Sequence, residues 1–190
     1  MTVHPATGAV MIKPSYLEAV DRSGVLGTLT AFGPRVAGTP PLGLDLPGSD
    51  IDILCHAPDP CTFAAVLWTA FSDYSDFSMR QWVDAERSVI ASFEAEGWQF
   101  EIFGQARPVA EQQGWRHFLV EQRLLAIGGP WLRTAVMAKR REGAKTEPAF
   151  AAALDLQGDP YQALLELEHW PDRVLAELIA TASNEMVVGG

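Results

Sequence analysis

Two carboxylates, Asp50 and Asp52, stand two residues apart in an apolar run. Because successive side chains of an extended strand point to opposite faces, we expect both aspartates on one face and Ile51 and Ile53 on the other. Like charges this close repel, and a divalent cation with oxygen ligands keeps both ionised. The pair therefore predicts a metal site for Mg²⁺ or Mn²⁺. The same spacing also occurs at solvated strand edges and in turns, where the side chains cap backbone amides.

A loop rich in glycine and proline, residues 38–49, precedes the two aspartates. Gly38 has no side chain, which lets the backbone approach a ligand closely. Thr39 adds a hydroxyl and an amide donor for a phosphate oxygen, and Ser49 offers similar donors just before Asp50. The loop therefore predicts a phosphate site beside the carboxylates.

A third carboxylate, Glu101, lies in the stretch 98–103, where apolar and polar residues alternate. The alternation places it on the face opposite its apolar neighbours. An acidic residue in such a strand often faces solvent. If the strand lies beside that of Asp50 and Asp52, the three carboxylates converge, and such a trio can hold two cations for phosphoryl or nucleotidyl transfer.

Composition and charge narrow the class of protein. The chain has 190 residues, and 48% of them are hydrophobic, which is the balance of a globular domain with a substantial core. The formal net charge is −10. Because binding to duplex nucleic acid depends on many Lys and Arg contacts to phosphates, we expect small molecules or proteins as partners instead.

The cysteines and the N-terminal segment indicate in which cellular compartment we expect the protein. Cys55 and Cys61 are too few for a zinc site, and we expect both as buried or half-buried thiols. Residues 1–10 lack the charged and apolar regions of a signal peptide, and no apolar run reaches the about 18–20 residues of a membrane span. These features predict a cytoplasmic protein without a membrane partner.

The elements that must position the carboxylates follow from the spacing of apolar residues. Helical spacing appears over 15–31, where glycines divide it, and over 63–71. Extended patterns predict a series of strands at 35–37, 50–56, 77–83, 87–93 and 98–103. Beyond Pro108 the pattern is helical, with a break at 128–130.

This order of elements predicts an α+β fold, in which a mixed β-sheet flanked by helices is followed by a C-terminal helical region. We place the α/β core at residues 1–107 and the helical region, packed on the core, at 108–190.

With these elements in place, the sequence resembles the nucleotidyltransferase superfamily, which includes kanamycin nucleotidyltransferase and DNA polymerase beta. Its minimal core reads Gly-Ser or Gly-Gly, then Asp-x-Asp after about a dozen residues, then a third acid on a later strand. Gly38-Thr39, Ser49-Asp50-Ile51-Asp52 and Glu101 take these places. Thr39 keeps the hydroxyl of the usual Ser, whereas Pro40-Pro41 removes two amide donors from the loop.

Within that superfamily the chain looks most like the DUF4269 family, through segments spread over nearly the whole chain: 38–45, 49–53, 101–105, 145–150 and 158–161. The resemblance implies a nucleotidyltransferase-like fold and a two-metal mechanism. Asp50 and Asp52 would hold Mg²⁺, and Glu101 would bind one ion and accept the proton of the attacking hydroxyl.

The resemblance further implies a reaction. A nucleoside monophosphate would pass from a nucleoside triphosphate to a hydroxyl of a small molecule or a protein. Gly38, Thr39 and Ser49 would bind the nucleotide, with Lys145 as a further contact. The segment after Lys145 also has the features of a helix start, with Thr146 as N-cap and Pro148 in the first turn.

A second interpretation retains the fold without fast chemistry, as a catalytically weak or inactive protein that binds nucleotides or proteins. The three acids favour chemistry, and the proline-stiffened loop favours the binding module. Two other features stay open between a structural and a phosphate-binding role. For Arg116 the alternatives are a salt bridge to Glu121 and a contact with a phosphate. For the basic cluster the alternatives are a solvated helix face and a phosphate clamp; its members are Arg133, Lys139, Arg140, Arg141 and Lys145.

Overall fold

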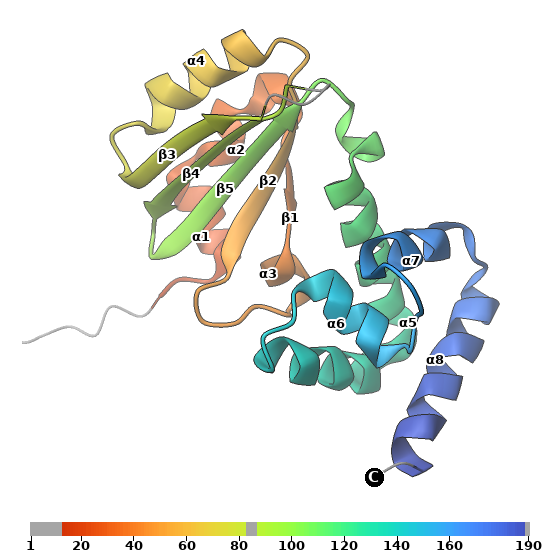
Figure 1. Ribbon diagram of the computed structural model, residues 1–190. Coiled ribbons are helices and arrows are strands. Elements are labelled where there is room, and N and C mark those ends of the chain that lie inside the picture. Colours follow the sequence, from red (N-terminus) through yellow and green to blue (C-terminus); the bar gives the residue numbers. More distant parts are fainter. Residues whose placement is uncertain (1–12, 83–86, 189–190) are drawn as a thin grey trace, which may run out of the picture.

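The computed structural model describes residues 13–82 and 87–188, whose arrangement is shown in Figure 1. Its centre is a five-stranded sheet with the order β1-β2-β5-β4-β3. The strands are β1 (Arg35–Ala37), β2 (Asp50–His56), β3 (Ser75–Gln81), β4 (Val89–Ala95) and β5 (Trp98–Gln105). Strands β2 and β5 run parallel, and the other neighbouring pairs are antiparallel. The predicted α+β fold with a mixed sheet is confirmed.

All five predicted strands are present, but several of them begin or end at other residues than predicted. Strand β3 begins two residues before the predicted start, and β4 runs two residues further along the chain than predicted. Val83, predicted as the last residue of β3, lies outside the described residues. Residues 38–49 were expected as a loop throughout, but they contain the short helix α3 (Thr39–Leu42), with Pro40 and Pro41 at positions where a helix needs no N–H partner.

The first helices cover one face of the sheet. Gly24 adopts a left-handed conformation (φ +64°) and separates α1 (Tyr16–Ser23) from α2 (Val25–Thr28), as the glycines predicted. A short 3-10 helix, η1 (Thr30–Phe32), follows. The core on this face joins residues of these helices to Ile51, Ile53, Phe100 and Ile102 of the two central strands. All four of these side chains are fully buried.

Helix α4 (Pro60–Phe71) packs on the same face. Asp59 caps it by accepting a hydrogen bond from the Cys61 amide. Phe63 of α4 lies directly over Gly104 of β5, where an added Cβ would be 2.1 Å from the Phe63 ring. Cys55 is buried in this core as predicted, whereas Cys61 is exposed because it sits in the first turn of α4, on its solvent side.

The C-terminal helices lie beside the opposite face of the sheet, next to β1 and β2 (Figure 1). The chain passes through η2 (Val109–Glu111) into the long helix α5 (Gln113–Arg141), which kinks at Gly129 and Pro130 as predicted. The remaining elements are α6 (Thr146–Ala153), α7 (Pro160–Glu166), η3 (Leu167–His169) and α8 (Asp172–Val188). Within the described ranges, no helix is long and apolar enough to cross a membrane.

A second hydrophobic core joins these helices to the sheet. Leu54 on β2 and Ala37 on β1 belong to it, together with Leu124 and Val136 of α5 and Phe150 of α6. Asp159 caps α7 through the Gln162 amide, as its position before a proline suggests. The N-cap of α6 is Lys145 rather than the predicted Thr146, which is the first helical residue.

Candidate active site

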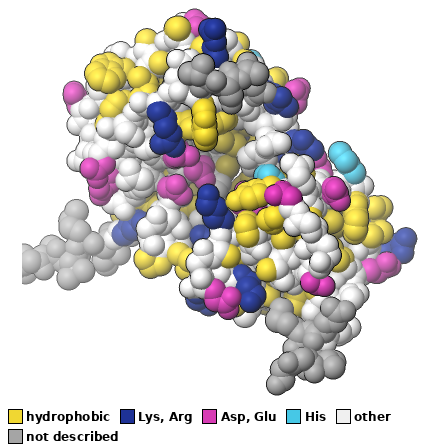
Figure 2. Space-filling view, viewed as in Figure 1, with side chains coloured by type: hydrophobic (Ala, Val, Ile, Leu, Met, Phe, Trp, Pro, Cys, Tyr) yellow, Lys and Arg dark blue, Asp and Glu magenta, His cyan; other side chains and the backbone are white. Residues whose placement is uncertain are grey.

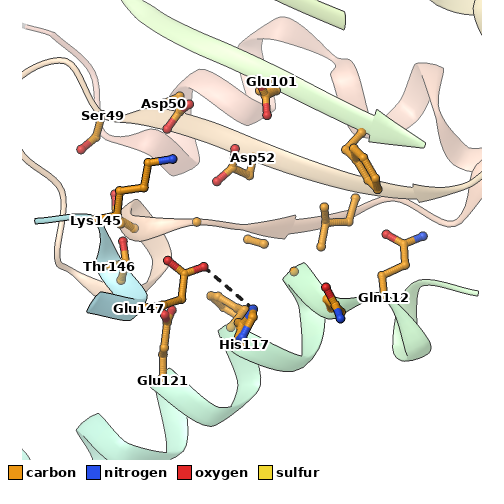
Figure 3. Close-up of a pocket in the computed structure, with 18 of the residues that line it drawn as sticks. Ser49, Asp50, Asp52, Glu101, Gln112, His117, Glu121, Lys145, Thr146 and Glu147 are labelled. Carbon is orange, nitrogen blue, oxygen red and sulfur yellow. Dashed lines mark ion pairs between the residues drawn. The ribbon is translucent and has the colours of Figure 1, made fainter. Parts of the chain in front are cut away.

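Strand β2 holds Asp50 and Asp52 on one face, because Ile51 and Ile53 between and after them are fully buried in the core on the other face. The register of the parallel pair places Asp52 directly beside Glu101 of β5. Neighbouring strands lie about 4.8 Å apart, and paired residues point to the same face. The structure thus brings the three predicted carboxylates together, and Figure 3 shows them facing one cavity.

Gly38 lies at the end of β1, where its neighbour Ala37 is paired with Asp52. The backbone at Gly38 has φ +78° and ψ −165°, a conformation open essentially only to glycine. A Cβ added there would lie 2.3 Å from Asp52 Oδ2. The glycine is therefore required both by the backbone conformation and by the close approach of the Asp52 carboxylate.

The loop between β1 and β2 is held in place by hydrogen bonds. Its second half closes on itself, because the Leu46 amide donates to Ser49 Oγ at 2.8 Å and the Ser49 amide donates to the Leu46 carbonyl at 2.9 Å. Arg133 of α5 donates to the carbonyl oxygens of Leu42 and Gly43. Arg133 is exposed on α5, as expected for a solvated helix face, and its guanidinium also holds the loop in place.

The carboxylates shift each other's ionisation. The pKa of Asp52 is raised to about 7, first by burial and then by the charges of Asp50, Glu101 and Glu147. Burial also raises the pKa of Glu101, although Arg80 opposes this, with Arg80 Nη2 at 3.4 Å from Glu101 Oε2. Part of the proton affinity of this site therefore comes from repulsion that a bound cation would remove.

Among residues 13–82 and 87–188, no three His, Cys, Asp or Glu side chains stand in an arrangement that ligates a metal ion as it is. The donor set nevertheless suits Mg²⁺, which prefers carboxylate oxygens and substrate phosphates. The raised pKa of Asp52 shows that uncompensated negative charge is concentrated there. Asp50, Asp52 and Glu101 therefore fit a divalent cation by their chemistry.

A cavity of about 1080 Å³ separates this face of the sheet from the helical region. Figure 2 shows the hollow and the acidic side chains at its edge. Every site residue predicted from the sequence lines it: Gly38, Thr39, Ser49, Asp50, Asp52, Glu101 and Lys145. Lys145 is exposed, at the N-terminus of α6. Residues far apart in the sequence thus surround a space large enough for a nucleotide.

The sequence pointed to Glu121 only as a partner for Arg116 and did not point to Glu147, yet both line this cavity. His117 and Glu121 lie on one face of α5, four residues apart, and are both buried. His117 Nδ1 is 3.9 Å from Glu147 Oε1 of α6. The four-residue spacing was the available signal, but spacing alone does not tell which helix face meets the sheet.

Arg116 does not pair with Glu121, as one interpretation had it. Its guanidinium Nε donates to Glu168 at 2.9 Å. Residues five apart on a helix point about 140° away from each other, so Glu121 turns into the cavity while Arg116 turns toward η3. The ion pair raises the pKa of Arg116 and lowers that of Glu168.

The predicted basic cluster does not form one surface. Arg140 lines the cavity and donates from Nη1 to the Thr146 hydroxyl. Burial lowers its pKa, and the nearby carboxylates, of which Glu121 has the largest effect, oppose that change. Lys139 instead pairs with Glu142 at 3.1 Å on the surface.

Comparisons with known proteins agree with this architecture. The family model described as "Domain of unknown function (DUF4269)" matches residues 18–167. The chain belongs to the DUF4269 family. No curated protein matches this DUF4269 chain by sequence.

Solved structures share the fold of this DUF4269 protein. A chain of the GLD-2/RNP-8 complex superposes with a TM-score of 0.54 at 12% identity, over 86% of this chain and 73% of that one. A chain of the Cid1 poly(U) polymerase with MgGTP bound has a TM-score of 0.49 at 17% identity, over 80% of this chain and 50% of that one. The DUF4269 protein thus spans about half of the Cid1 chain. At 12% identity the similarity to the GLD-2/RNP-8 chain shows the fold alone, which is nucleotidyltransferase-like.

Proposed function

We propose that this DUF4269 protein is a nucleotidyltransferase that depends on Mg²⁺ or Mn²⁺ and moves a nucleoside monophosphate from a nucleoside triphosphate to a hydroxyl of a small molecule or a protein. The observation that carries the proposal is the placement of Asp50, Asp52 and Glu101 on one face of two adjacent parallel strands. This face opens into a cavity of nucleotide size. The net charge of −10 disfavours duplex nucleic acid as the acceptor.

Each residue has an assigned task in this proposal. Asp50, Asp52 and Glu101 hold the cations, which when bound neutralise charge on the α-phosphate and the leaving pyrophosphate. Gly38, Thr39 and Ser49 direct backbone and hydroxyl donors at the phosphates. Lys145, exposed at the edge of the same cavity, contacts the outer phosphates.

Glu101 also acts on the acceptor. It takes the proton from the attacking hydroxyl, whose oxygen forms a bond to the α-phosphorus. The bond between the α-phosphorus and the bridging oxygen of the β-phosphate breaks, and pyrophosphate leaves.

The test uses α-labelled ATP, GTP, CTP and UTP with Mg²⁺ or Mn²⁺, together with a pool of small metabolites or a pool of proteins as acceptors. We expect pyrophosphate release and label transfer that stop in Asp52→Asn. The exposed variant Asp21→Asn, far from the cavity, serves as the control and retains the activity.

A second candidate function is a nucleotide- or protein-binding module with little or no turnover. It is favoured by Pro40 and Pro41, which remove two amide donors from the loop at the cavity. Metal-dependent binding of nucleoside triphosphates by calorimetry, without pyrophosphate release from any acceptor pool, would support this candidate and contradict the transferase.

A further inference from the structure

The helical wall of the cavity carries a patch that the proposed chemistry does not use. His117, Phe118 and Glu121 of α5 all line the cavity. Residues three and four apart share a helix face, so the three side chains form one continuous surface. This surface lies across the cavity from Asp50 and Asp52 (Figure 3).

Glu121 is the unusual member of this patch. Its side chain is 5% exposed, and its Oε1 has no hydrogen-bond partner in the described part of the chain. A buried polar atom left without a partner carries a free-energy cost. A ligand that donates a hydrogen bond to Glu121 would remove this cost. The unpaired oxygen therefore points to ligand binding rather than to a role in stabilising the fold.

His117 presents a second polar atom from the same surface. Its Nε2 is 3.0 Å from the Tyr161 carbonyl oxygen, which can only accept, so Nε2 carries the hydrogen. Nδ1 then faces Glu147 at 3.9 Å, beyond hydrogen-bond distance. A ligand can therefore meet both a carboxyl and a ring nitrogen on this wall.

The position of Glu121 fits the far end of a nucleotide. In Figure 3, Glu147 lies between Glu121 and the two aspartates, Asp50 and Asp52. Glu121 is therefore further than Glu147 from the side of the cavity that is proposed to bind the phosphates. In a nucleotide the ribose likewise holds the base away from the phosphates, so a base could reach Glu121 while the phosphates lie near the aspartates.

The surroundings of Glu121 favour a planar, uncharged ligand group over a phosphate. Leu54 and Phe103 of the sheet and Phe118 of α5 give the cavity apolar surface, on which a flat ring packs well. A phosphate has no N–H donor for Glu121 and would be repelled by Glu147, although Arg140, which also lines the cavity and acts on Glu121, opposes that repulsion. The edge of a nucleobase carries hydrogen-bond donors and acceptors side by side.

We propose that the α5 surface formed by His117, Phe118 and Glu121 binds the nucleobase of the triphosphate substrate, with Glu121 hydrogen-bonding to the edge of the base and setting the choice of base. This inference rests on the proposed function. Burial and the charge of Glu147 raise the pKa of Glu121 well above its ordinary value, and the charge of Arg140 opposes this. When protonated, the carboxyl offers an O–H donor next to a carbonyl acceptor, and when ionised it offers two acceptors; either arrangement can pair with the edge of a base.

The test compares ligands with and without a base. Dissociation constants of ATP, GTP, CTP, UTP and inorganic tripolyphosphate, each with Mg²⁺, are measured by calorimetry for the unmodified protein and three variants. Glu121→Leu keeps the volume and removes the hydrogen bonds, and Glu121→Gln keeps a donor and an acceptor in a fixed pattern. Glu166→Gln, exposed on α7, is the control.

We expect the unmodified protein to prefer the nucleotide with one of the four bases. Glu121→Leu should raise the dissociation constant of that nucleotide by at least about tenfold and change the dissociation constant of tripolyphosphate by less than about twofold. Glu121→Gln should change the order of the four nucleotides, which decides the matter if Glu121→Leu does not fold. Equal binding of all four nucleotides in every variant, or an equal loss of tripolyphosphate binding, overturns the base site alone. Failure of the unmodified protein to bind tripolyphosphate and all nucleotides overturns the proposed function as well.

Discussion

Asp52 and Glu101 occupy paired positions on the parallel strands β2 and β5. The backbone hydrogen bonds of the sheet set the distance between the strands, so the two carboxylates stay close although their residues are far apart in the sequence. Asp52 is also pressed against the backbone of Gly38 on its other side. The acidic site is therefore built into the rigid centre of the fold, and its charge has measurable consequences.

The first consequence is a pH-dependent stability caused by Asp52. Its pKa is about 7 in the folded state against an ordinary value of 3.8. The folded state therefore binds more protons between these values, and stability falls as the pH rises from about 4 to about 7. The loss is at most about 4 kcal/mol. Urea unfolding at a series of pH values should show a steeper fall for the unmodified protein than for Asp52→Asn.

The matched control is Asp21→Asn, on the exposed side of α1, which should follow the unmodified protein at every pH. Parallel stability profiles for Asp52→Asn and the unmodified protein would show that Asp52 titrates normally.

Divalent cations should stabilise the protein only where the carboxylates are ionised. At pH 8 and a Mg²⁺ concentration ten times the dissociation constant, binding adds about 1.4 kcal/mol, which corresponds to a rise of about 3–6 °C in the melting temperature. At pH 5.5 protonation of Asp52 competes with the ion, and the rise should be smaller. Differential scanning fluorimetry measures both, with NaCl of equal ionic strength as the reference. A rise that is independent of pH, or equal in NaCl, would speak against a carboxylate site.

Gly38→Ala should damage both the fold and the site. The new Cβ would require a rare backbone conformation and would collide with the Asp52 carboxylate at 2.3 Å. Gly33 also has a positive φ of +57°, in the left-handed region, but open space around it. Gly33→Ala therefore measures the cost of a left-handed conformation without a steric contact, about 1 kcal/mol. Chemical unfolding should show a larger loss for Gly38→Ala, together with loss of the Mg²⁺-induced stabilisation. Equal losses in the two variants would mean that the contact with Asp52 is unimportant.

Arg133→Lys should loosen the loop that lines the cavity. A lysine cannot reproduce the guanidinium contacts to Leu42 and Gly43. We expect a loss of about 1–2 kcal/mol in urea unfolding and weaker binding of Mg²⁺-tripolyphosphate in calorimetry. Arg141→Lys, exposed at the end of α5, is the matched control and should change neither. Unchanged tripolyphosphate binding in Arg133→Lys would mean that the contacts of Arg133 with the loop do not contribute to ligand binding.

Local patterns in the sequence determined the elements and the direction of several side chains. Alternation is a property of one strand, so it was enough to put Asp50 and Asp52 on one face and Glu101 opposite its apolar neighbours. The division of the first helix at Gly24 and the cap at Asp159 follow from local backbone chemistry in the same way. None of these features depends on what packs against the segment.

Only the tertiary structure decided what lies beside what. The pairing of β2 with β5 depends on a crossover through α4, β3 and β4, which no pattern within either strand records. The same reason explains why Arg116 reaches Glu168 and why Glu121 faces the cavity. The sequence shows on which face of a helix a charged side chain lies. It does not show the partner of that side chain, because the partner depends on which distant segments pack against the helix.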